Sequence, residues 1–345
     1  MKLLVIGGTV FLGRHIIDAA LARGHEVTMF NRGRSRPELY PDVERIIGDR
    51  DGDLAALKGR SWDAVIDTCG YVPRVVAKSA DALADRVAHY TFVSSISVYS
   101  DFGDRHKDES SPVGTLDDPS IEAVTGETYG PLKALCEQAV QQRLGERAFI
   151  VRPGLLVGPL DHTGRFTYWV TRVAAGGDVL APGDPGMQVE FIDTRDGAEW
   201  MVRCAEAKVT GVQNMTGPRE TLSMRAFLDA CRAALDPSSN FVWVDEQFLL
   251  ERGVKPWTEV PLWIPSGEQG LLSVSIDKAL ASGLTFRPLA DTLRDTLAWQ
   301  RSPEANRPLP ERISADPRPQ IGLLPERESA LLAEWAALRR TATTV

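Results

Sequence analysis

The chain has 345 residues, of which 43% are hydrophobic and 25% are charged, enough apolar material for one large or two modest globular domains. Its net charge of −8 disfavours a general nucleic-acid or anionic-membrane surface, because phosphate binding depends first on clustered positive charge. The four cysteines lie far apart, with no Cys-x-x-Cys pair and no histidine at ligand spacing. We therefore expect reduced thiols, no metal site and no disulfide framework.

The N-terminal stretch is an apolar run, Met1–Ile6, followed by the turn Gly7-Gly8-Thr9-Val10-Phe11-Leu12-Gly13 and a helical pattern over 14–23. This predicts a buried parallel strand, a glycine turn and a helix, the arrangement that seats a dinucleotide pyrophosphate on helix N–H groups. Val10 stands where the middle glycine of such a turn is usual. By itself the pattern also fits a tight strand-to-helix turn without a ligand.

Short apolar runs then alternate with helical patterns. The predicted strands are 25–31, 43–49, 63–68 and 89–94, and the predicted helix between the last two is 75–88. This order predicts an α/β fold with a Rossmann-type, doubly wound parallel sheet. Residues 101–127 interrupt it with eight acidic and two basic residues, which predicts a long solvent-facing loop.

The remaining elements complete the predicted domains. Helices are expected at 130–143, 168–175, 198–207 and 227–235, the last capped by Ser223, and strands at 148–152, 189–192 and 211–217. We assign 1–154 and 189–217 to a dinucleotide-binding domain, 155–188 and 218–301 to a smaller C-terminal substrate lobe, and 302–345 to a proline-rich tail with a helix. We interpret the amphipathic helix as a strap on the body rather than a partner-binding helix.

Tyr129 and Lys133 lie one helical turn apart on a predicted helix. A free phenol ionises near ~10, but a neighbouring ammonium and an oxidised nicotinamide ring would favour the phenolate, so the pair could do acid–base chemistry. The spacing also occurs by chance. A predicted strand upstream ends in Ser94, Ser95 and Ser97, at the sheet edge where such folds bind ligands. We interpret Ser94 as a structural cap.

These features resemble the extended short-chain dehydrogenase/reductases, the NAD-dependent epimerase/dehydratase family, over about residues 1–301. The resemblance rests on ordered motifs: the Gly-Gly-x4-Gly turn, Gly48-Asp49, Ser94-Ser95-x-x-Val98-Tyr99, Tyr129-x3-Lys133, Arg152-Pro153-Gly154 with Val157-Gly158-Pro159, and Phe191-Ile192-Asp193 before Arg195-Asp196. The glycine turn resembles an atypical subgroup whose members include reductases, sugar dehydratases and RNA-binding proteins.

The resemblance implies three catalytic residues: Tyr129 as general acid/base, Lys133 as the group that binds the nicotinamide ribose, and Ser95 as the hydroxyl that polarises the substrate oxygen. Besides Lys133, it implies that the cofactor is bound by Phe11, Leu12, Asp49, Thr68, Cys69 and Gly70. The turn pattern adds Gly7, Gly8, Thr9 and Gly13 to the expected cofactor-binding residues, and the end of the second predicted strand adds Asn31 and Arg32. No metal is implied.

The end of the second predicted strand bears on the choice of cofactor. An acidic residue there would bind the ribose diol of NAD, whereas this chain has Asn31, then Arg32, Arg34 and Ser35. Guanidinium groups suit a 2′-phosphate, so we favour NADP(H) and keep NAD(H) open. Two solvated arginines in a turn would give the same pattern.

The implied reaction moves a hydride at a carbinol or keto carbon of a sugar or nucleotide-sugar. Dehydration is disfavoured because Ile96 and Ser97 stand where an Asp-Glu pair would be needed. We favour a reductase slightly over an epimerase. The alternative is a non-catalytic relative that senses a dinucleotide or binds RNA, but the acidic charge shows no RNA footprint.

The sequence also bears on the partners and the location of the protein. The N-terminus shows no signal-peptide pattern, and we expect a cytoplasmic protein with no membrane or nucleic-acid partner. By analogy with the family, a homodimer could form through 75–88 and 130–143. Candidate partners for a substrate diphosphate are Arg165, Arg172 and Arg195, with surface arginines as the alternative.

Overall fold

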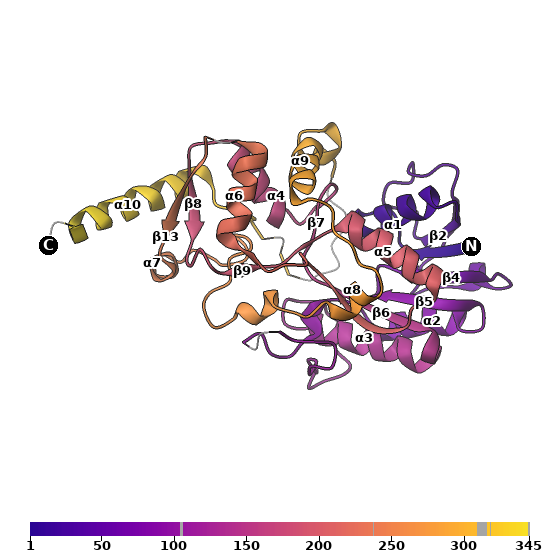
Figure 1. Ribbon diagram of the computed structural model, residues 1–345. Coiled ribbons are helices and arrows are strands. Elements are labelled where there is room, and N and C mark those ends of the chain that lie inside the picture. The colour runs from indigo at the N-terminus through magenta and orange to yellow at the C-terminus, as the bar shows by residue number, and fades with distance from the viewer. Residues whose placement is uncertain (104–105, 237, 309–315, 318, 344–345) are drawn as a thin grey trace.

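The computed structural model describes residues 1–103, 106–236, 238–308, 316–317 and 319–343 (Figure 1). A seven-stranded sheet forms its centre, and every neighbouring pair of its strands is parallel. The strands in spatial order are β11 (Gly211–Met215), β6 (Ala148–Pro153), β5 (Val87–Val93), β4 (Trp62–Asp67), β1 (Lys2–Ile6), β2 (Glu26–Asn31) and β3 (Glu44–Ile47). The predicted doubly wound fold is confirmed.

Helices cover both faces of this sheet. On one face α1 (Phe11–Ala22) packs beside α5 (Thr194–Ala207), and on the other α2 (Pro73–Leu83) packs beside α3 (Tyr129–Leu144) (Figure 1). The strand order reverses between β1 and β4, which creates a switch point at their carboxyl ends. The register pairs Ile6 of β1 with Asp67 of β4, and Asp67 with Phe92 of β5, so these strands end side by side.

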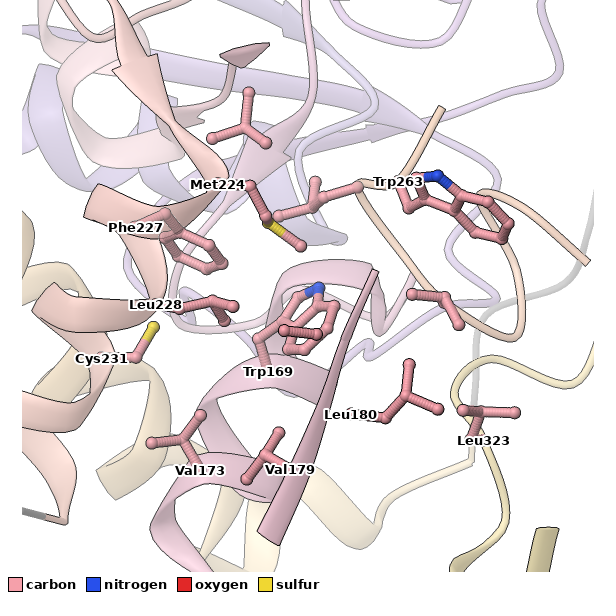
Figure 2. Close-up of a cluster of buried hydrophobic side chains, with 14 of the residues drawn as sticks. Trp169, Val173, Val179, Leu180, Met224, Phe227, Leu228, Cys231, Trp263 and Leu323 are labelled. Carbon is pink, nitrogen blue, oxygen red and sulfur yellow. The ribbon is translucent and has the colours of Figure 1, made fainter. Parts of the chain in front are cut away.

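A second lobe has its own core. It contains α4 (Arg165–Ala174), β8 (Asp178–Pro182), α6 (Met224–Leu235), β13 (Asn240–Val244), α7 (Glu246–Glu251) and α9 (Leu289–Gln300). Figure 2 shows Trp169 of α4 among Met224 and Phe227 of α6 and Leu180 of β8, all at most 1% exposed. The remaining short elements are β7 (Leu156–Val157), which pairs with β10 (Ile192–Asp193), β9 (Gln188–Val189), which pairs with β12 (Leu222–Ser223), and α8 (Asp277–Ala281), which packs near β11.

The structure corrects part of the predicted secondary structure. The predicted strand 189–192 is two separate strands, β9 and β10, which pair with β12 and β7 and do not belong to the central sheet. The predicted helix 75–88 ends at Leu83, and β5 begins at Val87 because that residue pairs with Trp62 of β4. The sequence pattern does not predict the ladder between β8 and β13. Each strand is a short apolar run that becomes a strand only by pairing with the other, which is distant in sequence. The capping role predicted for Ser223 is confirmed, because its hydroxyl accepts a 3.1 Å hydrogen bond from the Ala226 amide.

The acidic loop is less solvent-facing than its composition predicts. Lys107 is only 6% exposed and the side chain of Glu109 only 3%. The Glu109 carboxylate accepts a 2.9 Å hydrogen bond from the backbone amide of Asn214 in β11 and lies 3.1 Å from the ammonium of Lys278. The loop is therefore fixed to the edge of the central sheet, because a buried carboxylate needs such partners.

The C-terminal helix α10 (Pro325–Thr343) extends outward from the second lobe (Figure 1). Its first half packs on that lobe, as the strap interpretation expects: Leu331 is buried, and the Trp335 indole donates a 3.0 Å hydrogen bond to the Trp243 carbonyl. Further along, Leu338 is 44% exposed. Among the helices in the described part of the chain, none combines the length and apolar character needed to span a membrane.

Candidate active site

The glycine turn joins β1 to α1 in a conformation that side chains would block. Gly7 and Gly8 have φ values of +104° and +91°, and a Cβ at Gly13 would lie 2.8 Å from the Cα of Gly8. Helix α1 therefore begins against the backbone of the turn, and the side chain of its N-cap residue, Val10, makes no hydrogen bond to its first N–H groups. Val10 has an extended φ of −126°, which any residue adopts, and this explains why a glycine is not needed at position 10.

A cavity of about 1530 Å³ opens above the carboxyl ends of the strands. Of the predicted catalytic and cofactor-binding residues, Gly70 alone is not on its wall. The others all line it: Gly7, Gly8, Thr9, Phe11, Leu12, Gly13, Asn31, Arg32, Asp49, Thr68, Cys69, Ser95, Tyr129 and Lys133. The cavity lies at the switch point, where open α/β sheets bind ligands.

Tyr129 and Ser95 meet on this wall. Tyr129 is the first residue of α3, and Ser95 follows β5. Burial raises the pKa of the Tyr129 phenol, and an interaction with the Ser95 hydroxyl partly opposes that shift. Ser95 is oriented by Ser97, whose amide donates to the Ser95 Oγ over 3.1 Å.

Lys133, one turn after Tyr129 on α3, is only 3% exposed. Its Nζ donates to the carbonyl oxygens of Gly70, at 2.7 Å, and Val93, at 2.6 Å. It also lies 4.5 Å from the ring centroid of Phe92 and 5.2 Å from that of Tyr71. Burial lowers the pKa of Lys133 to about 8, because an ammonium is costly in an apolar environment.

Ser94 faces away from this group, into a buried polar network. Its hydroxyl donates to a carboxylate oxygen of Glu137, which also binds the guanidinium of Arg152 through two hydrogen bonds of 2.9 and 2.7 Å. A buried pair of this kind fixes α3 against β6. These contacts agree with the structural interpretation of Ser94.

At the other end of the cavity, the residues after β2 form the wall. The amide of Asn31 donates to the Gly7 carbonyl at 2.8 Å, and its oxygen accepts from the Gly33 amide at 2.9 Å. Asn31 therefore holds the glycine turn in place. Arg32, Arg34 and Ser35 also line the cavity here.

Sequence reasoning missed several wall residues. One of them is Trp257, which lies in an irregular segment that no motif marks. The Arg165 guanidinium lies over the Trp257 ring, 5.3 Å from the ring centroid. Of the three candidate diphosphate partners, Arg165 lines the cavity. Arg172 instead pairs with Glu328, and Arg195 with Asp193.

The family model described as the NAD dependent epimerase/dehydratase family matches residues 3–216. The Arabidopsis thaliana chloroplast stem-loop binding protein of 41 kDa b is 25% identical over 209 residues, which are 54% of this chain and 50% of that protein. The chain thus spans about half the length of this curated relative.

Two solved structures illustrate the likeness in fold. Human epimerase family protein SDR39U1 (isoform 2) with NADPH has a TM-score of 0.59 and 22% identity, over 86% of this chain and 99% of that chain. UDP-glucuronic acid 4-epimerase from Bacillus cereus, in complex with NAD, has a TM-score of 0.62 and 17% identity, over 87% of this chain and 96% of that chain. The glycine turn, the strand order and the family match over residues 3–216 lead to one conclusion: the chain belongs to the NAD dependent epimerase/dehydratase family.

Proposed function

We propose that the chain is an NADP(H)-dependent reductase that acts on the keto group of a sugar or nucleotide-sugar, with Ser95, Tyr129 and Lys133 as its catalytic residues. The observation that carries this proposal is the meeting of Tyr129 and Ser95 on the wall of the cavity that also contains the glycine turn. Family membership and the NADPH and NAD bound to the two similar structures support a nicotinamide dinucleotide as cofactor.

The residues present fit such a cofactor. Helix α1 begins close against Gly8, and the side chain of its N-cap residue, Val10, makes no hydrogen bond to its first N–H groups. Helix N-termini bind phosphate groups well. When bound, the dinucleotide supplies or accepts the hydride. Thr68 and Cys69 line the part of the cavity between the glycine turn and Lys133, and Asp49 lines the part beyond β3, where the adenine would bind.

The chain's own groups would handle the proton. Tyr129 would protonate the substrate oxygen from its phenol, while Ser95 donates a hydrogen bond to the same oxygen. An ammonium has three N–H donors, and two of those on Lys133 are used by backbone carbonyls. The third would be left for a ribose hydroxyl, and the positive charge would stabilise the phenolate that forms once Tyr129 has given up its proton.

The preference for NADP(H) is supported by the wall beyond β2. This wall contains two guanidinium groups, on Arg32 and Arg34, and the hydroxyl of Ser35. These groups would bind a 2′-phosphate and lack the carboxylate that favours a free diol. The Asn31 side chain, already bound to the backbone at both ends, would shape this subsite rather than bind the ribose.

The substrate class is supported by the second-lobe wall. Arg165 and Trp257 offer a guanidinium stacked on an aromatic ring, a combination that binds a diphosphate or carboxylate beside a flat or ring-shaped group. The Bacillus cereus relative acts on UDP-glucuronic acid, which has these features.

Epimerisation is the second candidate, because the same three residues could perform it and the relative from Bacillus cereus is an epimerase. The two reactions differ in the fate of the cofactor, which a reductase exchanges in each cycle and an epimerase retains. RNA binding, suggested by the name of the plant relative, has no support in the net charge of −8.

The test begins with protein purified without added ligand. Acid extraction and chromatography would identify any retained dinucleotide, and NADPH oxidation would then be followed with 4-keto nucleotide-sugars. Stoichiometric retained NAD with no NADPH turnover would replace the reductase by an epimerase. A stem-loop RNA shift at physiological salt, without turnover of any sugar, would replace both.

A further inference from the structure

A largely buried ion pair, of which Arg50 lines the cavity and Asp67 lies behind it, has no part in the proposed reaction. Arg50, after β3, binds both carboxylate oxygens of Asp67, the last residue of β4, at 2.8 and 2.7 Å. Asp67 is completely buried, and the side chain of Arg50 is 11% exposed. Tyr90 also donates to Asp67 at 3.0 Å, and Arg50 donates to the Ser79 hydroxyl at 2.6 Å. Such a pair adds little net stability, because desolvation offsets the attraction, so another role is expected.

The pair is connected to Lys133 through the backbone. Both Asp67 oxygens bind Arg50, and one of them, Oδ1, also accepts a 3.2 Å hydrogen bond from the backbone amide of Cys69. The next residue is Gly70, whose carbonyl accepts the 2.7 Å hydrogen bond from Lys133. The carboxylate therefore fixes the backbone turn that receives the ammonium.

The two charges also affect Lys133 in opposite directions. Burial is the main cause of its lowered pKa, the Asp67 carboxylate raises that pKa and the Arg50 guanidinium lowers it. Lys133 also interacts with Cys69 and Tyr71 after β4 and with Cys136 and Glu137 on its own helix, and Tyr129 lies one turn earlier on α3.

We propose that Arg50 and Asp67 are positioning residues for Lys133: together they fix the 68–70 turn and balance the charge next to the ammonium. This inference rests on the function proposed above for Lys133. The network itself, however, can be measured in the unliganded protein, without any substrate.

The experiment is an NMR titration of the Lys133 Nζ in the full-length protein labelled with 15N-lysine, with Lys133→Arg for assignment. Asp67→Asn leaves Arg50 uncompensated and should move the titration midpoint down by about one pH unit. Arg50→Gln leaves Asp67 uncompensated and should move it up by a similar amount. The double variant should return it towards the wild-type value.

Arg50→Lys tests the positional part separately, because it keeps the charge and loses the two-pronged contact. It should leave the midpoint within about 0.3 pH unit and speed amide hydrogen exchange at Cys69 and Gly70 by about tenfold. Arg172 and Glu328 provide a matched control, since this ion pair lies in the second lobe, away from the cavity. Arg172→Gln and Glu328→Gln should change neither readout.

The inference is overturned if the Asp67 and Arg50 variants shift the midpoint in the same direction or not at all while they lower stability. A failure of the proposed function looks different. Calorimetric titration with NADP+ and NAD+ should show weaker binding in Asp67→Asn. If the midpoints move as expected and dinucleotide binding stays the same, the network is established and the assignment of Lys133 to the cofactor is wrong.

Discussion

The Nζ of Lys133 lies 2.6 Å from the carbonyl oxygen of Val93, the last residue of β5. Tyr129 lies one turn before Lys133 on α3, and Ser95 follows Val93 by two residues. This hydrogen bond therefore joins the helix that carries the phenol to the strand end that carries the alcohol. Because strand and helix are both packed in the core, Tyr129 at the start of α3 and Ser95 directly after β5 are held close to elements whose positions the core fixes.

Tyr129→Phe should lower turnover by about 10²–10⁴-fold, because the proposed acid–base group is lost while the ring remains. NADP+ affinity, measured by calorimetry, should stay within about threefold, since the phenol is not expected to hold the dinucleotide. Tyr40→Phe is the control, because Tyr40 hydrogen-bonds Asp18 away from the cavity. Equal losses of turnover in the two variants would contradict the role of Tyr129.

Arg34→Ala should weaken NADPH binding by about tenfold and leave NADH binding unchanged, because only the former has a 2′-phosphate. Fluorescence titration with both dinucleotides measures this selectivity. The matched surface variant is Arg60→Ala, whose guanidinium pairs with Glu44 outside the cavity. Tighter NADH than NADPH binding in the wild-type protein would favour NAD instead.

Gly13→Ala should remove dinucleotide binding and lower the free energy of unfolding by about 1–3 kcal/mol, because the new Cβ would overlap the backbone of Gly8. Helix α1 would have to move away from the turn. Gly186→Ala is the comparison, since its nearest neighbours are side-chain atoms of Asp184. Calorimetric binding and urea unfolding of both variants check the prediction.

Lys133 should make stability depend on pH in the alkaline range. Its pKa is about 8 in the folded protein, whereas an ordinary lysine, as in the unfolded chain, has a pKa of 10.5. The unfolded chain therefore binds the proton more tightly. The resulting destabilisation is full below pH 8 and disappears as the pH rises to 10.5, a change of about 3 kcal/mol. Urea unfolding of wild type and Lys133→Met at pH 8 and 10 should show that the wild type gains relative to the variant. A constant difference would contradict the lowered pKa.

Much of the fold could be predicted from local sequence, because the strands of the parallel sheet are buried on both faces and so read as apolar runs. Prediction failed where pairing overrides local preference. The alanine-rich stretch after Leu83 favours helix, but Val87 pairs with Trp62 and starts a strand. The β8–β13 ladder joins segments about 60 residues apart, so neither strand has a local signal.

Part of the site could be predicted from the sequence. Motifs identified Ser95, Tyr129 and the glycine turn, which lie on regular elements or directly at their ends. Arg50 and Asp67 were not recognised, because a buried ion pair between two strand ends has no fixed spacing in sequence. Trp257 comes to the cavity from the second lobe, and only the packing of the two lobes reveals it.

Glu190 provides a test in the opposite pH range. It is 7% exposed, and burial raises the pKa of its carboxyl to about 7 although the Gln188 amide donates to it at 2.8 Å. Below pH 4.5 the group is protonated in both states and costs nothing. As the pH rises to 7, the Glu190 carboxyl ionises in the unfolded chain before it ionises in the folded protein. The free energy of unfolding therefore falls by up to about 3 kcal/mol. Glu190→Gln keeps the shape without the charge and should therefore be more stable than wild type at pH 7.5, with the advantage gone at pH 4.5. Urea unfolding at the two pH values would measure this, and an advantage that does not grow with pH would show that the carboxylate is well solvated in the native state.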